Sequence, residues 1–222
     1  MSDFQTVLET ALSRAGGEEA LKRRLPVPKS AAELRAIGDD RYLSQMSLRI
    51  FRAGLKHSMV DGKWPAFEEV FHGFDPRRVR AMNDEDLQAL LADARIIRHW
   101  GKIRAVRHNA AALCELAESA GGMGAYLADW PAGEEVALWD DLAKRFTQLG
   151  GNSGPSFLRM VGRDTFVLTP YVVRALAHWG AYEGKAKGKR ELAKIQEAFN
   201  GWAAATGRPL CHLSMILAIS VD

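Results

Sequence analysis

The chain of 222 residues is long enough for one well-buried domain, or for two small lobes that share a core. Its hydrophobic content of 47% and its charged content of 26% exclude a globally disordered protein. The formal net charge of +3 permits a polyanionic partner without requiring one.

Apolar residues recur at helical spacing along the chain, and prolines and glycines mark where the predicted helices end. Pro26 and Pro28 force extended backbone, and Ser30 with Glu33 predicts a capping box for a short helix. The predicted helices of the first half cover 4–24, a short segment after Ser30, 42–60, 63–71, a segment from Pro76, 84–92 and 96–119.

The second half of the chain continues this helical pattern. Its predicted helices cover 134–149, a segment through Met160, 170–179, 190–206 and 209–219. Residues 184–189 form a solvated linker rich in lysine and glycine. Because the strand signal is weak throughout, we predict an all-α protein.

The two cysteines and the N-terminal residues bear on the compartment. Cys114 and Cys211 lie far apart in apolar helical patterns, which predicts free, buried thiols. The sequence offers no zinc-type Cys/His cluster, no basic and apolar signal peptide and no apolar run of membrane-spanning length. We therefore expect a cytoplasmic protein with no metal, no cofactor and no membrane partner.

The densest cluster of glycines predicts a tight hairpin between two helices. Glycines permit positive φ, so successive backbone N–H groups can point at one phosphate, and the next helix N-terminus adds partial positive charge. An ordinary glycine-rich turn would have the same composition. The candidate DNA-binding residues are Leu149, Gly150, Gly151, Asn152, Ser153 and Gly154.

A second candidate DNA contact is the basic helix predicted over 96–119. Arg98 and Lys102 are four residues apart and share one face, as do Arg104 and Arg107. Charged residues on a helix also form ordinary solvated faces, and the sequence leaves both interpretations open.

Three motifs occur in a fixed order along the chain: 51–55 (Phe-Arg-Ala-Gly-Leu), 67–76, which ends in Phe-Asp-Pro, and 93–103, which is followed by Asn109-Ala110. Their order and spacing resemble those of the DNA-3-methyladenine glycosylase I family, within the helix-hairpin-helix glycosylase superfamily. With the hairpin, the resemblance runs from about Arg41 to Trp179.

The resemblance implies an all-α, helix-hairpin-helix DNA glycosylase-like bundle, compatible with two lobes around a central cleft. We expect one domain over 1–222. Its expected parts are an N-terminal helical extension (1–38), a central helical lobe (39–130), the hairpin and pocket helices (134–180) and the C-terminal helices (190–222).

A glycosylase takes its target base out of the duplex and holds it between aromatic or apolar walls. The candidates for the base pocket and its support are Phe51, His57, Trp64, Arg98, His99, Trp100 and Lys102. Aromatic residues at helical spacing are also typical of an ordinary core, and the sequence does not separate the two roles.

The chain departs from the family's pattern on one side of the expected site. The glutamate that contacts the damaged base in the family falls on Arg49, and the tryptophan after the Gly-Leu pair falls on His57. The family's zinc ligands have no counterparts here. A packed pair of C-terminal helices can replace a structural metal.

A second departure concerns the catalytic aspartate that follows the hairpin in the wider superfamily. Thr169 or Tyr171 falls at or near that position, and the nearest acid, Asp164, lies in the preceding turn. The resemblance therefore makes Tyr171, Thr169 and Arg49 the candidate catalytic residues.

Arg49 conflicts with a positively charged substrate such as an N3-alkylated adenine. Two like charges about 4 Å apart cost roughly 4 kcal/mol at an effective dielectric constant of 20. We expect a cationic base to be held poorly unless an acid such as Asp40 or Glu68 neutralises Arg49.

The sequence favours a DNA glycosylase that hydrolyses the N-glycosidic bond of an alkylated purine such as 3-methyladenine after base flipping. The expected partner is double-stranded DNA that contains a damaged base, bound by a monomer. A non-catalytic protein that recognises damaged or distorted DNA is the second hypothesis, favoured by the replaced acids. A helical interaction protein that has kept only the scaffold is the third.

Overall fold

The computed structural model describes residues 4–221, and every regular element within this range is helical. The all-α prediction is confirmed. The helices are α1 (Phe4–Ala15), α2 (Glu18–Lys22), α3 (Ala31–Arg35), α4 (Asp39–Arg52), α5 (His57–Val70), η1 (His72–Phe74, a 3₁₀ helix), α6 (Pro76–Ala81), α7 (Asp84–Ala89), α8 (Trp100–Ala120), α9 (Met123–Asp129), α10 (Glu135–Arg145), α11 (Ser153–Val161), α12 (Pro170–His178), α13 (Lys189–Thr206) and α14 (Leu210–Ile219).

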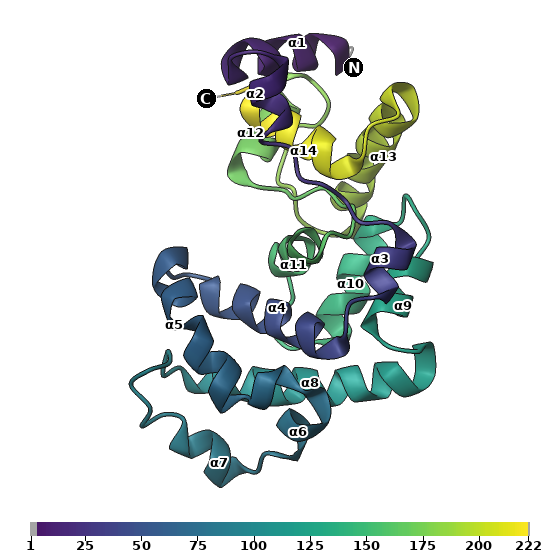
Figure 1. Ribbon diagram of the computed structural model, residues 1–222. Helices are drawn as coiled ribbons and strands as arrows, with labels where there is room; N and C mark the ends of the chain where they lie inside the picture. Colours follow the sequence, from purple (N-terminus) through teal and green to yellow (C-terminus); the bar gives the residue numbers. More distant parts are fainter. Residues whose placement is uncertain (1–3, 222) are drawn as a thin grey trace.

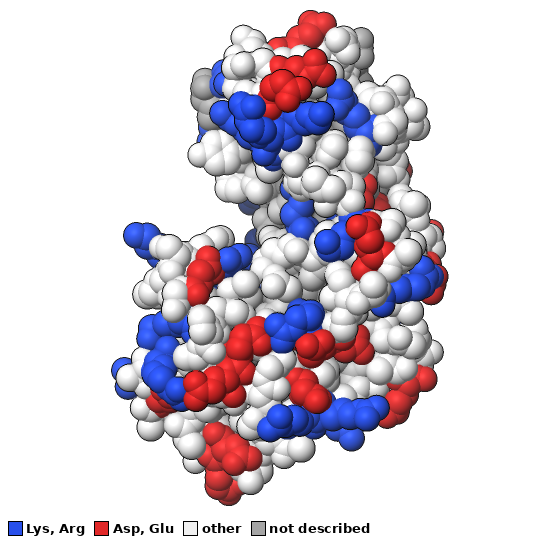
Figure 2. All heavy atoms as spheres, viewed as in Figure 1, with Lys and Arg blue, Asp and Glu red and all other residues white. Residues whose placement is uncertain are grey.

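The helices form two lobes that meet at α11 (Figure 1). Helices α3 to α10 build the lower lobe in this view, and α1, α2 and α12 to α14 build the upper lobe. Both ends of the described chain lie in the upper lobe, because α1 and α12 pack against α14. Figure 2 shows a hollow between the two lobes at the left edge of the molecule. The four-part division of the chain stays a prediction.

Helix α4 is the central helix of the lower lobe. It packs against α5, α8 and α11, and its buried residues therefore extend over more than one face. They include Tyr42, Leu43, Met46, Ile50 and Phe51. Because α11 rests on α4, this helix also supports the segment that connects the two lobes. No helix of residues 4–221 is long and apolar enough to cross a lipid bilayer.

Several predicted helix boundaries are wrong, each for a local reason. The helix expected over 4–24 breaks at Gly16 and Gly17, whose φ values of 87° and 105° lie outside the helical region. The helix expected over 42–60 ends at Arg52, because the backbone turns at Gly54 (φ 75°), and α5 begins at His57.

Two further helices are shorter than the sequence predicted. The helix expected over 96–119 begins only at Trp100, where the His99 side chain caps it. The helix expected over 134–149 ends at Arg145, and residues 146–152 form the hairpin loop.

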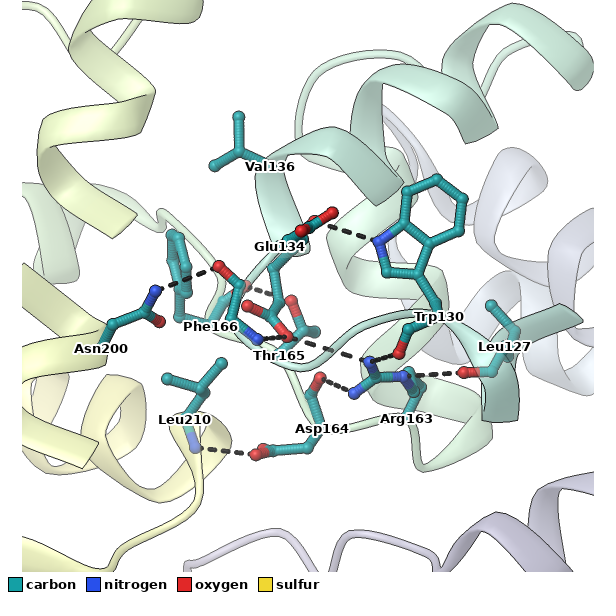
Figure 3. Close-up of polar contacts among 12 residues, drawn as sticks. Leu127, Trp130, Glu134, Val136, Arg163, Asp164, Thr165, Phe166, Asn200 and Leu210 are labelled. Carbon is teal, nitrogen blue, oxygen red and sulfur yellow. Dashed lines mark hydrogen bonds and ion pairs between the residues drawn. The ribbon is translucent and has the colours of Figure 1, made fainter. Parts of the chain in front are cut away.

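The segment after α11 ties the two lobes together (Figure 3). The Arg163 guanidinium donates to the carbonyl oxygens of Leu127 at 3.1 Å and Trp130 at 3.4 Å in the lower lobe. The neighbouring Asp164 carboxylate accepts the backbone N–H groups of Leu210 at 2.9 Å and Cys211 at 2.8 Å, at the start of α14. Two adjacent side chains therefore fix α9 and α14 relative to each other.

We predict that Gly124→Ala destabilises the lower lobe. A Cβ at position 124 in α9 would lie 2.5 Å from the Leu34 carbonyl oxygen, so α3 and α9 would have to separate. Such overpacking costs about 1–3 kcal/mol. The control is Gly62→Ala in α5, where a Cβ meets nothing within 4 Å, and where alanine should add about 0.5–1 kcal/mol. Urea unfolding of both variants measures the difference, and equal stabilities would contradict the close packing of α3 and α9.

Candidate active site

The hairpin loop between α10 and α11 presents unpaired backbone donors. The N–H groups of Gly150, Gly151 and Asn152 make no hydrogen bond to any described residue, and all three residues are exposed. They stand immediately before the N-terminus of α11, where the helix dipole favours an anion. The geometry suits a phosphate group.

The tight path of this loop explains its glycines. Gly151 has a φ of 57°, and a Cβ on Gly154 would lie 2.9 Å from the Leu149 carbonyl oxygen. Gln148 also has a positive φ of 66°, although it is not a glycine. Leu149 is buried and anchors the loop to the core, whereas Ser153 begins α11.

Three side-chain contacts hold the hairpin in place. Asn109, fully buried in α8, accepts the Thr147 N–H at 2.7 Å and donates to the Thr147 carbonyl oxygen at 3.1 Å. Gln148 Nε2 donates to the Gly101 carbonyl oxygen at 2.9 Å, in the first turn of α8. Asn152 Nδ2 donates to the Leu168 carbonyl oxygen at 2.8 Å, just before α12. Sequence reasoning placed Asn109 in a family motif but missed its structural role.

The first turn of α8 also contacts the end of α4. The His99 Nδ1 atom accepts the Lys102 N–H at 3.3 Å, which caps α8. The buried Lys102 ammonium donates to the carbonyl oxygens of Ala53 at 2.7 Å and Phe51 at 3.2 Å. Burial lowers the pKa of Lys102, and the charge of Arg49 lowers it further. Lys102 is thus a capping residue for α4.

Arg49 is a partly buried cation that no carboxylate neutralises. Its Nε atom is buried, and its guanidinium makes no hydrogen bond or ion pair with any described residue. Asp40 and Glu68 each pair with Arg41 instead, both at 2.9 Å. Burial, with a smaller effect of the Arg52 charge, lowers the pKa of Arg49, but an arginine stays protonated in proteins. The sequence left its neutralisation open, and the structure shows none.

The aromatic pocket candidates separate into core and surface. Phe51 is fully buried, with its ring centroid 4.5 Å from that of Phe67. Trp64 stacks against Phe67 at 4.9 Å and Phe74 at 5.4 Å, and its Nε1 donates to Ser44. Phe51 and Trp64 are therefore neighbours in the lower-lobe core, which supports the interpretation of both as core residues over that of base-pocket walls.

The other pocket candidates lie closer to solvent. His57, Arg98 and His99 are exposed, at the first turn of α5 and just before α8. Trp100 is partly buried, and the Arg104 guanidinium lies 5.7 Å from its ring centroid. These residues lie at the beginning of α5 and around the beginning of α8.

Thr169 and Tyr171 lie at the start of α12 in the upper lobe. The Thr169 hydroxyl accepts the Val172 N–H at 3.2 Å and so caps the helix. Tyr171 is 53% exposed, and Arg174 lies 5.5 Å from its ring centroid. No hydrogen bond joins either residue to Arg49 in the described part of the chain. Arg49 and Lys102 are thus close enough for their charges to interact in the lower lobe, whereas Thr169 and Tyr171 belong to the upper lobe.

A cavity of about 1010 Å³ lies elsewhere in the lower lobe. Its lining includes Asp39 and Asp40 at the start of α4, Arg77 in α6 and Glu118 near the end of α8. The hairpin contacts the opposite end of α8. We regard this cavity as separate from the candidate site.

Comparison with known proteins decides the family. A model of the methyladenine glycosylase family matches residues 34–147, just over half of the chain. The chain belongs to the methyladenine glycosylase family. The match ends at the start of the hairpin loop, so the hairpin and the upper-lobe helices lie outside it.

Two curated relatives in this family are similar over part of their length. DNA-3-methyladenine glycosylase 1 of Escherichia coli strain K12 is 43% identical over 68 residues, which is 31% of this chain and 36% of that protein. DNA-3-methyladenine glycosylase of Haemophilus influenzae is 36% identical over 61 residues, or 28% and 33% of the two chains. The chain thus spans about a third of the length of each curated relative.

Solved structures extend the likeness of the fold. A crystal structure of 3-methyladenine DNA glycosylase I is 25% identical, with a TM-score of 0.51 over 64% of this chain and 84% of that one. An 8-oxoguanine glycosylase/lyase of Methanocaldococcus jannaschii in complex with DNA has a TM-score of 0.57 at 13% identity, over 96% and 95% of the two chains. The second likeness concerns the fold alone, and it includes both lobes. The prediction of a helical DNA glycosylase fold is confirmed.

We predict that Asn109→Ala impairs both stability and DNA binding. It removes two hydrogen bonds to the backbone that leads into the hairpin, so the free energy of unfolding should fall by about 1–3 kcal/mol. DNA affinity, measured where both proteins are folded, should fall about tenfold. The control is His108→Ala, an exposed position of the same helix that should change stability by less than about 0.5 kcal/mol. A loss of stability with unchanged affinity would contradict the role of Asn109 in positioning the hairpin.

Proposed function

We propose that this protein is a base-excision repair DNA glycosylase, which hydrolyses the N-glycosidic bond of a damaged purine after flipping it from the duplex. The hairpin carries the proposal: its unpaired N–H groups and the N-terminus of α11 would bind a phosphate, and the chain belongs to the methyladenine glycosylase family. The proposed substrate is double-stranded DNA that contains a damaged base, bound by a monomer.

The surroundings of the hairpin fit a bent duplex with one base displaced. Leu55 and Met59 expose 37% and 45% of their surface where α4 leads into α5. Exposed apolar side chains can insert between base steps and stabilise a kink. The hairpin N–H groups would hold the backbone without reading sequence, as a protein that searches for damage requires.

The proposed chemistry uses no carboxylate on the sugar side. The Asp164 carboxylate is engaged by two backbone N–H groups of α14, and it lies in the joint between the lobes. Tyr171 is the candidate for orienting the attacking water because its side chain is exposed at the start of α12. Thr169 would help to position Tyr171, because its capping bond fixes the start of α12. Arg49 would contact the base.

A second function has a specific observation in its favour. Thr169, which falls at or near the superfamily's catalytic position, and Asp164, the nearest acid in the sequence, are both occupied by backbone contacts. A protein that binds damaged or distorted DNA without cleaving it would have no need of a free acid there. It would still require the hairpin.

We predict that the protein releases free base from damaged DNA in single turnover, and that Tyr171→Phe slows this release about a hundredfold. The substrates are duplexes that contain 3-methyladenine, 7-methylguanine or hypoxanthine. The control is Tyr182→Phe, which also removes a hydroxyl but one that bonds Glu191 in the upper lobe. Binding without release from any duplex would favour the non-catalytic function instead.

We also predict that Gly151→Val weakens DNA binding at least tenfold. A valine there must adopt a positive φ, and this strain would distort the loop that presents the unpaired N–H groups. Gly207→Val imposes a similar strain at a φ of 66° in the upper lobe, between α13 and α14, and should not change affinity. Anisotropy titrations over a range of salt should show a shallower salt dependence for Gly151→Val, because one phosphate contact is lost. Equal affinity losses in both variants would exclude the hairpin as the phosphate site.

A further inference from the structure

The candidate site contains two cations and no acid to balance them. Arg49 makes no hydrogen bond or ion pair with any described residue, and its Nε atom is buried. Its neighbour Lys102 donates to two carbonyl oxygens, so its positive charge also stays without a carboxylate. A buried, unpaired donor costs free energy until a ligand supplies an acceptor. A ligand with hydrogen-bond acceptors would satisfy this donor.

Arg49 lies close to the place where the hairpin would hold DNA. The hairpin residue Gln148 donates a hydrogen bond to Gly101 in the first turn of α8. Lys102, which follows Gly101 in the sequence, donates to the carbonyl oxygen of Ala53, and Ala53 is four residues after Arg49. One short chain of contacts thus connects the phosphate site to the last turns of α4. Figure 1 shows these last turns at the left of the lower lobe, on the side where Figure 2 shows the hollow between the lobes.

The shape and charge of Arg49 restrict the ligand further. A guanidinium presents N–H donors in a planar fork and pairs best with two acceptors in one plane. On a purine, O6 and N7 form such a pair, and arginine commonly reads them together. A 6-amino group offers a donor in place of O6, and alkylation at N7 removes the second acceptor and adds a positive charge. The charges of Arg49 and Lys102 would repel such a cation.

We propose that Arg49 selects an uncharged 6-oxopurine, such as hypoxanthine, by donating to O6 and N7, and that the site rejects purines made cationic by N3 or N7 alkylation. The proposal rests on the proposed function, because it requires a flipped base at this site. It assigns this chain a substrate class that differs from the 3-methyladenine in the names of its relatives.

The same contact would assist the chemical step. When the C1′–N9 bond of a neutral purine breaks, the electron pair stays on the base, which leaves as an anion. A water oxygen bonds to C1′ and loses a proton to solvent, and the base takes up a proton from solvent. The guanidinium of Arg49 stabilises the negative charge that develops on the base. A base that is already cationic gains nothing from this contact.

The test compares two bases that differ by a methyl group at N7, at a pH low enough for the methylated base to keep its N1 proton and its positive charge. Duplexes with a single 2′-fluoro nucleotide, which resists cleavage, carry hypoxanthine or 7-methylhypoxanthine, and a third duplex carries a tetrahydrofuran abasic site. Anisotropy titrations at fixed salt give the dissociation constants for the parent protein, Arg49→Gln and Arg49→Glu. Arg80→Gln serves as a matched control because it removes one charge from an exposed arginine of α6 with no partner in the described chain.

We expect the parent to bind hypoxanthine about tenfold to a hundredfold more tightly than 7-methylhypoxanthine. Arg49→Gln should abolish the preference, Arg49→Glu should reverse it, and Arg80→Gln should leave it unchanged. A parent that prefers 7-methylhypoxanthine, or shows no preference, overturns the proposal. A loss in Arg49→Gln that is equal for all three duplexes would assign Arg49 to a backbone phosphate and also overturns it.

Failure of the proposed function gives a different result. Duplexes with ordinary deoxyribose at hypoxanthine report base release in single turnover. If the protein prefers hypoxanthine but releases no base, the proposed recognition by Arg49 stands and the proposed catalysis fails. If the protein releases 3-methyladenine and shows no preference for hypoxanthine, the proposed glycosylase function stands and the 6-oxopurine substrate class is excluded.

Discussion

The buried ammonium of Lys102 joins the end of α4 to the beginning of α8, and the arrangement of the site depends on this contact. The last carbonyl groups of a helix have no partner within the helix, and the helix dipole places partial negative charge there. Lys102 satisfies two such carbonyls, those of Phe51 and Ala53. This explains how a buried lysine can remain without a carboxylate. The hydrogen bonds and the dipole together offset the cost of its burial.

Arg49 has no comparable compensation. Its guanidinium makes no hydrogen bond with a described residue, and the two acids that could have neutralised it, Asp40 and Glu68, are bound to Arg41. Two positive charges consequently remain at the junction of α4 and α8. The family relationship gives the scaffold, but this charge is a property of the individual site residues, and site residues determine the chemistry.

The fold followed from the sequence more closely than the site did. Helical spacing and the family motifs predicted the all-α architecture because periodicity and glycine placement are local properties of the chain. The breaks at Gly54 and after Arg145 were missed, since the apolar pattern continues through both. The turn after Arg145 is stabilised by Asn109, which is 38 residues earlier in the sequence. No local pattern reports such a long-range contact.

The same limitation explains the uneven outcome for the site residues. Phe51 and Trp64 suit a base pocket or a core by composition, and only packing against Phe67 shows that they lie in the core. The unusual charge at position 49 was visible in the sequence, because the resemblance placed a glutamate there. The sequence could not show whether an acid neutralises Arg49, because Asp40 and Glu68 could pair with either Arg41 or Arg49. The three-dimensional structure shows that both acids pair with Arg41.

The two departures from the family's pattern become consistent when they are considered together. A carboxylate near the sugar favours glycosidic cleavage by stabilising positive charge on the ribose, whereas a cation near the base favours it by stabilising negative charge on the leaving group. Here Asp164, the acid nearest in sequence to the superfamily's catalytic position, is committed to the α14 backbone, and an unpaired guanidinium lies in the last turn of α4. Under the proposed function, electrostatic stabilisation would act on the base and not on the sugar. Such a site is poorly suited to a base that already carries a positive charge, and it is suited to a neutral purine that must leave as an anion.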